Sequence, residues 1–180
     1  MGTENKHIIK ILKTHSELVK EIKILAKKLN KKFVEKDKEV VLISIIKGGL
    51  PFTLELMKHL DFDVSMDFIS SSSYYLDKQI SEARVKYDAT IPIKGKDIII
   101  TDDLVDSGKT LNKVCEILEA YEPKSITVSA IYGKPKRLKT KYDELFCWEE
   151  EPGGFLLGFG LDYDEKYRNL PYIAIIKEDE

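Results

Sequence analysis

The sequence has few cysteines and histidines and no long apolar run. Its two cysteines, Cys115 and Cys147, lie in a helical and a strand pattern, so we expect reduced core thiols and no disulfide framework. The three histidines are too scattered for a zinc signature. Charged side chains interrupt residues 1–13, and no apolar run approaches membrane length. We therefore expect no secretory signal, no membrane partner and a cytoplasmic location.

An excess of one charge is also lacking. The chain has 29 basic and 31 acidic residues, which gives a formal charge of -2. This balance argues against a broad nucleic-acid-binding face, although it permits local basic patches. We expect small polar ligands and no nucleic acid. With 43% hydrophobic content in 180 residues, the sequence can bury one core of ordinary size, so residues 1–180 are predicted to form a single domain.

Helix and strand patterns alternate along the chain. Thr14 and Glu17 form a candidate capping box. Apolar side chains follow at helical spacing, at Leu18, Ile22, Leu25 and Leu29. A nearly unbroken apolar run over 40–46 predicts a strand covered on both faces, and a glycine turn and a helix starting near Pro51 come next.

The alternation continues to the C-terminus. Further strands are predicted over residues 64–71, 98–101, 125–132, 155–161 and 172–176. The helix before Pro123 has its predicted apolar face at Leu111, Val114, Leu118 and Tyr121. This order predicts an α/β fold in which a parallel-rich, twisted sheet has helices on both faces. The ligand site of such a sheet lies at the carboxyl ends of its strands.

The segment 98–111, IIITDDLVDSGKTL, concentrates polar chemistry after a buried strand. Asp102 and Asp103 offer hard oxygen atoms for ribose hydroxyls or a hydrated Mg²⁺, and the amides after Asp106 can converge on a phosphate at a helix N-terminus. A purely local interpretation makes the acid pair turn residues, with Asp106 and Ser107 as helix caps. A Walker A loop is excluded, because Asp103 stands where that motif needs its first glycine.

Taken as a set, the paired acids, Asp106 and the following Ser-Gly-Lys-Thr resemble the phosphoribosyl pyrophosphate motif of the type I phosphoribosyltransferases. Asp102 departs from the family's usual Glu-Asp pair. Residues 47–49, Lys-Gly-Gly, could form a simple turn, but beside the first motif they resemble the pyrophosphate-binding loop of the purine members. FLLGFGLDYDEKYRNLPYIAII at 155–176 closely resembles the signature segment of hypoxanthine-guanine phosphoribosyltransferases. The resemblance covers most of residues 40–176.

This resemblance implies purine salvage. A 5-phosphoribosyl group would pass from phosphoribosyl pyrophosphate to N9 of the 6-oxopurine bases hypoxanthine or guanine, giving IMP or GMP and pyrophosphate. The family fold would add a small hood subdomain, about residues 142–170, and a flexible lid loop, about residues 72–95. Mg²⁺ would accompany the pyrophosphate, and the chain would form a homodimer or homotetramer.

The resemblance also implies roles at the nucleotide end of the site. Asp106 would be the catalytic residue that exchanges a proton with N7 of the purine. The 5′-phosphate would be held by Ser107, Gly108, Lys109 and Thr110. Lys134 would donate to O6 and so reject adenine, whose amino group offers no acceptor there, while Lys136, Arg137, Lys139 and Lys141 are assigned to a basic surface loop. Phe155 would stack on the base, and Leu156 would offer its backbone groups to the purine edge.

At the other end, the resemblance implies that Lys47, Gly48 and Arg168 bind the pyrophosphate. Asp162 would hold Mg²⁺, with Asp102 and Asp103 as further metal and ribose ligands. Ser73 and Tyr74 match the Ser-Tyr pair of the lid loop, although the sequence after them departs from the pattern usual in bacterial members. Without the resemblance, Phe155 would be interpreted as a core residue and Arg168 as a surface residue.

Two other functions stay open at this point. A transferase of the same fold could prefer xanthine, because backbone groups that the sequence does not reveal read the 2-position of the base. A regulator could retain the fold to sense phosphoribosyl pyrophosphate while it binds nucleic acid. Such a regulator should carry an added DNA-binding domain or a basic face, and we expect neither here.

Overall fold

The structure, a computed structural model, describes residues 8–34, 39–72, 84–86, 90–133, 142–148 and 154–176. Its larger sheet has the strand order β4-β3-β2-β5-β6-β7. The members of this sheet are β2 (Val40–Ile46), β3 (Val64–Ser72), β4 (Arg84–Lys86), β5 (Asp97–Val105), β6 (Ser125–Gly133) and β7 (Asp143–Trp148). All neighbouring pairs are parallel except β3 with β4. The predicted parallel-rich sheet is therefore confirmed.

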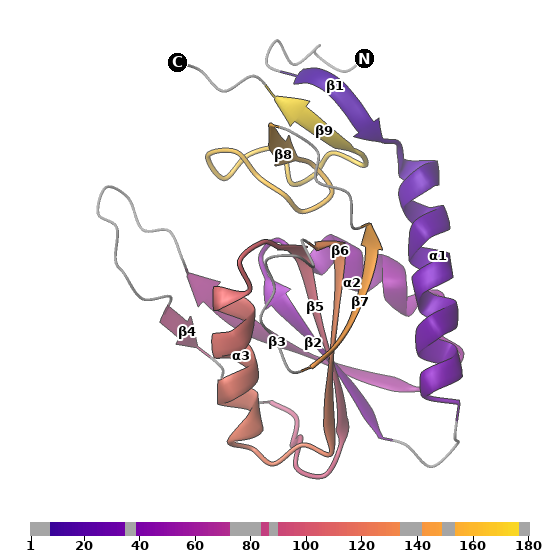
Figure 1. Cartoon of the computed structure of the whole chain (residues 1–180), viewed down its shortest axis with the longest axis vertical. Helices are drawn as coiled ribbons and strands as arrows, with labels where there is room; N and C mark the ends of the chain where they lie inside the picture. Colours follow the sequence, from indigo (N-terminus) through magenta and orange to yellow (C-terminus); the bar gives the residue numbers. More distant parts are fainter. Residues whose placement is uncertain are drawn as a thin grey trace.

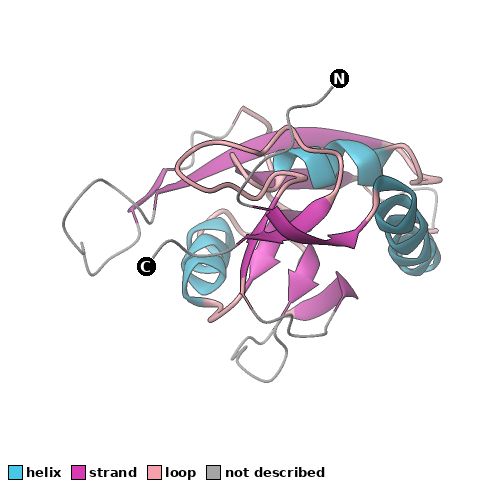
Figure 2. Ribbon diagram, turned by 90° about the horizontal axis from the view of Figure 1, so that it is seen from above, coloured by secondary structure: helices cyan, strands magenta, loops and turns pink. Residues whose placement is uncertain are grey.

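Helices cover both faces of this sheet (Figures 1 and 2). Helices α1 (His15–Lys32) and α2 (Leu50–Met57) pack on one face, and α3 (Lys109–Glu119) packs on the other. The central strand β2 contributes buried side chains to the apolar clusters on both faces, because its run of aliphatic residues alternates between them. The core thus has two apolar layers that hold the carboxyl ends of the strands in fixed positions.

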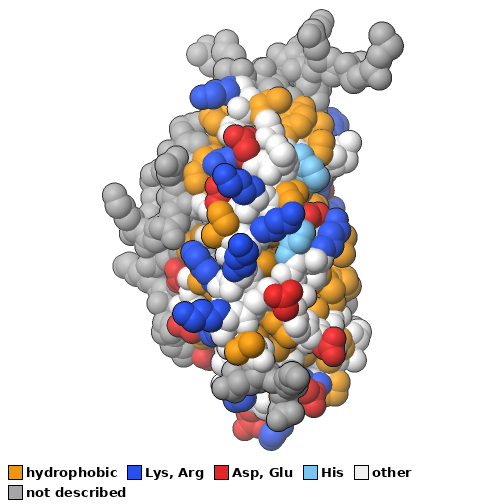
Figure 3. Space-filling view, turned by 90° about the vertical axis from the view of Figure 1, so that its right-hand side faces the viewer, with side chains coloured by type: hydrophobic (Ala, Val, Ile, Leu, Met, Phe, Trp, Pro, Cys, Tyr) orange, Lys and Arg blue, Asp and Glu red, His pale blue; other side chains and the backbone are white. Residues whose placement is uncertain are grey.

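Helix α1 begins as the sequence predicts. The Thr14 hydroxyl accepts from the Glu17 backbone amide, and the Glu17 carboxylate accepts from the Thr14 amide at 2.8 Å. The inner face consists of the predicted side chains, with Ala26 added: Leu18, Ile22, Leu25, Ala26 and Leu29. Figure 3 shows basic side chains, coloured alike for Lys and Arg, gathered on the side of the molecule that α1 covers. The helix therefore presents an apolar stripe to the sheet and a basic face to solvent.

The smaller sheet has the antiparallel order β1-β9-β8. It combines β1 (Ile8–Lys13), β8 (Phe155–Leu157) and β9 (Ile173–Ile176), and it lies beyond the carboxyl ends of the larger sheet (Figure 1). Phe159, Leu161 and Ile173 join the same apolar cluster as α1 and α2. This packing places the segment between β8 and β9 near the edge of the larger sheet where a ligand site is expected.

Several element boundaries differ from the sequence-based expectations. Strand β5 runs to Val105, beyond the predicted end at residue 101, and so includes the acid pair. Tyr121 is 43% exposed and follows the end of α3, while Cys115 takes a buried place on that helix. Strand β8 ends at Leu157, short of the predicted Leu161, and β1 was not predicted at all. Cys115 and Cys147 are free thiols, as expected.

The predicted lid and hood are two subdivisions of the single domain. The lid of about 72–95 falls largely outside the described residues, and the hood of about 142–170 stays a prediction. Strand β7 pairs with β6 in the larger sheet. No helix in the described part of the chain is long and apolar enough to cross a membrane.

Candidate functional site at the carboxyl ends of the strands

The two adjacent acids lie in the last residues of β5. Asp102 pairs with Ala130 of β6, and the ladder resumes at Leu104, so the interpretation of the acid pair as turn residues is wrong. The Asp102 carboxylate accepts from the Asp103 amide at 3.0 Å, and the Asp103 carboxylate accepts from the Leu104 amide at 2.8 Å. These bonds fix both carboxyl groups at the carboxyl edge of the sheet.

The acid pair is electrostatically unfavourable as it stands. Burial, followed by the charge of Asp103, raises the pKa of Asp102 well above its ordinary value. Burial also raises the pKa of Asp103, although its hydrogen bonds and the nearby Arg168 guanidinium oppose this effect. Two such carboxyls favour a bound proton or a cation between them. The pair therefore has the chemistry of a site for a divalent ion or for sugar hydroxyls.

The Lys-Gly-Gly loop after β2 closes directly on this pair. A Cβ atom on Gly48 would lie 2.0 Å from Oδ2 of Asp103, and one on Gly49 would lie 2.8 Å from the Thr101 carbonyl oxygen. The peptide bond between Ile46 and Lys47 is cis. Both glycines thus allow a backbone approach that a side chain would block, which supports the interpretation as a ligand loop over that as a simple turn.

The segment between β8 and β9 contacts the other side of this loop. A Cβ atom on Gly160 would lie 2.0 Å from the carbonyl oxygen of Gly48. That glycine has a φ of 104°, which is the left-handed region. Nη1 of Arg168 donates to the Gly160 carbonyl at 2.8 Å. The arginine is consequently held beside the glycine loop, and its charge is felt at Asp103.

Four charged side chains meet beside the glycine loop. Nη2 of Arg168 lies 2.8 Å from Oδ1 of Asp162 and 3.3 Å from Oε2 of Glu165. The same Glu165 oxygen lies 2.9 Å from Nζ of Lys47. Lys47, Asp162 and Arg168 were all predicted from the sequence. Glu165 was not predicted, because the motif DYDEKYR does not indicate which cations this side chain contacts in the folded protein.

The loop from Asp106 to Thr110 leads into α3. The N-cap of α3 is Gly108, with a φ of 71° and no side-chain capping bond, so the interpretation of Asp106 and Ser107 as the cap of this helix is wrong. The first amides of a helix have no partner inside it, and the first bond here runs from Asn112 to Gly108. Asp106, Ser107 and Lys109 are exposed. The helix N-terminus therefore has the donors and the access that an anion needs.

Phe155 and Leu156 lie in β8 of the smaller sheet. Phe155 is 39% exposed and packs edge-on against Tyr163, with ring centroids 5.6 Å apart. It is therefore not a core side chain, and its ring has an accessible surface on which a planar ligand can stack.

A buried chain of hydroxyl groups supports the site from beneath. The Thr53 hydroxyl of α2 lies 2.6 Å from the Thr101 hydroxyl of β5 and 2.8 Å from both the Ser44 hydroxyl and the Gly49 carbonyl. All three hydroxyl-bearing residues are fully buried. Thr53 thus ties the glycine loop to the strand that carries the acids. No sequence pattern indicates this role, since a lone threonine in a helix is unremarkable.

Not every predicted residue can be placed. Ser73, Tyr74 and Lys134 lie outside the described residues. Among those that are described, no group of three or more His, Cys, Asp or Glu side chains could hold a metal ion. Asp102, Asp103 and Asp162 therefore do not converge on one point by themselves, and a metal at the pair would need oxygen atoms from its ligand or from water.

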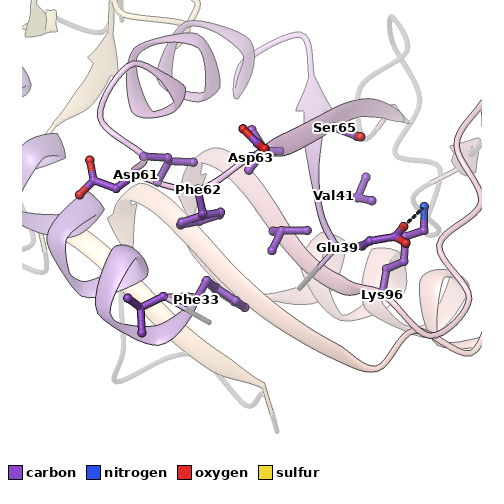
Figure 4. Close-up of a pocket in the computed structure, with 12 residues that line it drawn as sticks. Phe33, Glu39, Val41, Asp61, Phe62, Asp63, Ser65 and Lys96 are labelled. Atoms are coloured by element: carbon purple, nitrogen blue, oxygen red, sulfur yellow. Dashed lines mark ion pairs between the residues drawn. The ribbon is translucent and has the colours of Figure 1, made fainter. Parts of the chain in front are cut away.

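A separate cavity of about 820 Å³ lies at the opposite edge of the sheet (Figure 4). It is lined by the end of α1 and by the starts of β2 and β3. Its Glu39 is paired with Lys96 at 2.7 Å, and its Asp61 accepts from the Asn30 amide group at 2.8 Å. Two of its three acids are thus already engaged, whereas the carboxyl edge has an unstable acid pair, glycine loops and a helix N-terminus. We assign the function to the carboxyl edge.

Comparisons with known proteins agree with this assignment. A family described as the phosphoribosyl transferase domain matches residues 9–164. The chain is 36% identical over 173 residues to a hypoxanthine-guanine phosphoribosyltransferase of Streptococcus pyogenes, covering 96% of this chain and 95% of that protein.

Solved structures show the same likeness. A hypoxanthine-guanine phosphoribosyltransferase of Bacillus anthracis superposes with a TM-score of 0.82 at 32% identity, over 94% of this chain and 99% of that one. A hypoxanthine phosphoribosyltransferase of Trypanosoma cruzi, in complex with the product IMP, has a TM-score of 0.84 at 31% identity, over 98% of each chain. The similarity therefore extends over nearly the whole length of these relatives.

Proposed function

Because this chain belongs to the hypoxanthine-guanine phosphoribosyltransferase family of type I phosphoribosyltransferases, we propose that it makes IMP or GMP from hypoxanthine or guanine. The donor is phosphoribosyl pyrophosphate, the acceptor atom is N9 of the base, and pyrophosphate is released. The observation that carries the proposal is the approach of Gly48 to Asp103, since it brings a pyrophosphate loop and a ribose-binding acid pair into contact. The IMP complex of the Trypanosoma cruzi relative supports the same ligand class.

The pyrophosphate end of the donor is assigned to the glycine loop and the cations beside it. The backbone at Gly48 can approach phosphate oxygens because it carries no side chain. Lys47 supplies a point charge, and the Arg168 guanidinium supplies a planar fork of donors that suits two oxygens. These groups stabilise the negative charge that grows on pyrophosphate as the bond to C1 of the ribose breaks.

The nucleotide end is assigned to the loop between β5 and α3. The helix amides, together with Ser107, Lys109 and Thr110, hold the 5′-phosphate. Asp106 exchanges a proton with N7 of the purine as the glycosidic bond forms. Phe155 stacks on the base, and the backbone of Leu156 contacts its edge. Lys134 is proposed to read O6, which an adenine lacks.

The family uses its donor with Mg²⁺, and the acid pair fits that ion. Asp102 and Asp103 are adjacent carboxyls whose pKa values are raised, chiefly by burial. A bound cation would stabilise their ionised forms. Mg²⁺ is commonly held by one or two carboxylates together with substrate phosphates and water, so a site without a third acid is adequate. When bound, Mg²⁺ neutralises charge on the leaving pyrophosphate. Asp102 and Asp103 are the proposed ligands at this site, and they also orient the ribose hydroxyls. Asp162, which does not converge with them, is proposed as a metal ligand from the resemblance alone.

The remaining partners follow from the family. We propose that the chain acts as a homodimer or homotetramer, with Ser73 and Tyr74 in a lid that keeps water from the ribosyl centre. Sedimentation analysis measures the assembly directly. A single monomeric species at working concentration contradicts that part of the proposal.

A competing-substrate assay tests the reaction itself. The purified protein is supplied with Mg²⁺, phosphoribosyl pyrophosphate and each of hypoxanthine, guanine, xanthine and adenine in turn. The proposal expects nucleotide and pyrophosphate in equal amounts from the first two bases and none from adenine. A clear preference for xanthine supports the related transferase instead, and no product from any base contradicts the proposal.

A further inference from the structure

Glu165 takes a position between the two cations that are assigned to pyrophosphate. Its Oε2 atom lies 2.9 Å from Nζ of Lys47 and 3.3 Å from Nη2 of Arg168. A single carboxylate oxygen therefore bridges the cation of the glycine loop and the cation of the segment between β8 and β9. Phosphate oxygens would need the same donors.

The contacts of Arg168 show that it has further capacity for an anion. Nη1 is used by the Gly160 carbonyl and Nη2 by the two carboxylates. Nε of Arg168 is buried and has no hydrogen-bond partner among the described residues. Buried donors usually have an acceptor, so the arginine is only partly satisfied by the acids of its own segment. An anion with several oxygens could satisfy it more fully than Glu165 does.

The backbone brings Glu165 to this position through an unusual turn. Asp164, Glu165 and Tyr167 have φ angles of 52°, 60° and 72°, the left-handed region that side-chain-bearing residues rarely adopt. The Glu165 amide donates to Oδ2 of Asp162 at 3.0 Å. Clusters of such residues occur where a function requires the conformation. This turn directs the Glu165 side chain to the cations of the site.

We infer that Glu165 acts as an internal substitute for the pyrophosphate group, and that it must leave Lys47 and Arg168 before phosphoribosyl pyrophosphate can bind. This inference rests on the proposed function. The side chains of Lys47 and Glu165 are 68% and 65% exposed, so water screens their attraction and the pair opens readily. Glu165 therefore competes only modestly with pyrophosphate. This competition lowers the affinity of the protein for the donor and for the released pyrophosphate.

A solvated surface pair is the simplest alternative explanation. Such a pair would affect stability slightly and would leave the affinity for the donor unchanged. A competing anion makes a different prediction, because its removal frees both cations and strengthens binding of pyrophosphate. The affinity for pyrophosphate therefore separates the two explanations.

Glu165→Gln is the test variant, since it keeps the shape of the side chain and removes its charge. Asp164→Asn is the matched control: it removes the same charge from the same turn, but Asp164 pairs with Lys166 at 3.0 Å. Binding of inorganic pyrophosphate is measured by calorimetry in the presence of Mg²⁺ at fixed salt. The Michaelis constants for phosphoribosyl pyrophosphate and hypoxanthine are measured in parallel.

The inference expects Glu165→Gln to bind pyrophosphate about threefold to fivefold more tightly, the upper part of the range of an exposed ion pair. The Michaelis constant for the donor should fall by a similar factor, while that for hypoxanthine and all constants of Asp164→Asn should stay near wild type. Unchanged or weaker pyrophosphate binding by Glu165→Gln overturns the inference, as does a wild-type protein that binds no pyrophosphate. If the calorimetric gain appears in a protein that makes no nucleotide, the inference about the anion site stands and the proposed reaction fails.

Discussion

Gly48 and Asp103 lie so close together that a Cβ atom on the glycine would be 2.0 Å from Oδ2 of the aspartate. Gly48→Ala must therefore displace either the glycine loop, which is proposed to bind pyrophosphate, or the Asp103 carboxylate, which is proposed to bind ribose. We predict a loss of at least about 100-fold in kcat/KM for phosphoribosyl pyrophosphate, the scale of a misplacement of about 1 Å. Steady-state kinetics measures this loss, and thermal unfolding is the control for folding. A folded variant with normal kcat/KM contradicts the close approach.

The buried hydroxyl of Thr53 predicts an effect on stability. Thr53→Val keeps the volume but leaves the hydroxyls of Ser44 and Thr101 and the Gly49 carbonyl without this partner. We expect the free energy of unfolding in urea to fall by about 1–3 kcal/mol. Ser44→Ala should cost less, because Thr53 then retains two of its three partners. Equal losses in the two variants would show that Thr53 has no special place in the chain of hydroxyls.

The acid pair predicts a dependence of stability on pH. The native pKa of Asp102 is raised, so between the ordinary pKa and the native pKa the folded state binds more protons than the unfolded state. The free energy of unfolding of protein treated with a chelator should fall as pH rises through that window, and Asp102→Asn should reduce the fall. Chemical unfolding at a series of pH values measures it. The raised pKa is contradicted if the free energy of unfolding of the wild type rises across this pH window and rises faster than that of Asp102→Asn.

Asp106→Asn separates proton transfer from donor binding. A positioned acid or base typically contributes about 10²–10⁴ in rate, so kcat should fall by at least about 100-fold. The Michaelis constant for phosphoribosyl pyrophosphate should stay near wild type, because the helix amides remain in place. Turnover close to that of the wild type would remove Asp106 from the mechanism.

Cys147 predicts low thiol reactivity in the folded protein. Burial, followed by the nearby charge of Glu21, raises the pKa of this thiol to about 12, and Cys115 is fully buried. At about pH 8 the thiolate fraction of Cys147 would be on the order of 10⁻⁴. Alkylation followed by mass spectrometry should label neither cysteine quickly until guanidinium unfolds the chain. Fast labelling of Cys147, which is only partly buried, would contradict the raised pKa of its thiol.

The sequence predicts best those features that depend on neighbouring residues. The Thr14–Glu17 capping box and the buried run of β2 are confirmed, because their signals are local periodicity and local hydrogen bonds. The end of β5 was wrong because aspartates are rare in strands, whereas pairing with β6 holds Asp102 in the ladder. β1 was missed because its partner, β9, lies at the other end of the chain.

The site shows the same division. The residues of the glycine loop and of the Asp106 loop are predictable from motif and turn chemistry. The contact between Gly48 and Asp103, the hydroxyl of Thr53 and the bridge through Glu165 are not, because each depends on segments that meet only in the folded chain. The spacing of residues in a motif identifies which side chains have suitable chemistry for a site. Tertiary packing decides which of these side chains come into contact.

The position of a bound product tests the account most directly. A crystal structure of the protein with IMP should show the 5′-phosphate on the amides between Ser107 and Thr110, with the Asp106 carboxyl facing N7 of the base. Phe155 should lie against the purine ring. A nucleotide bound elsewhere, for example in the cavity lined by Phe33 and Phe62, or an Asp106 carboxyl directed away from the base, would contradict the assignment of this site.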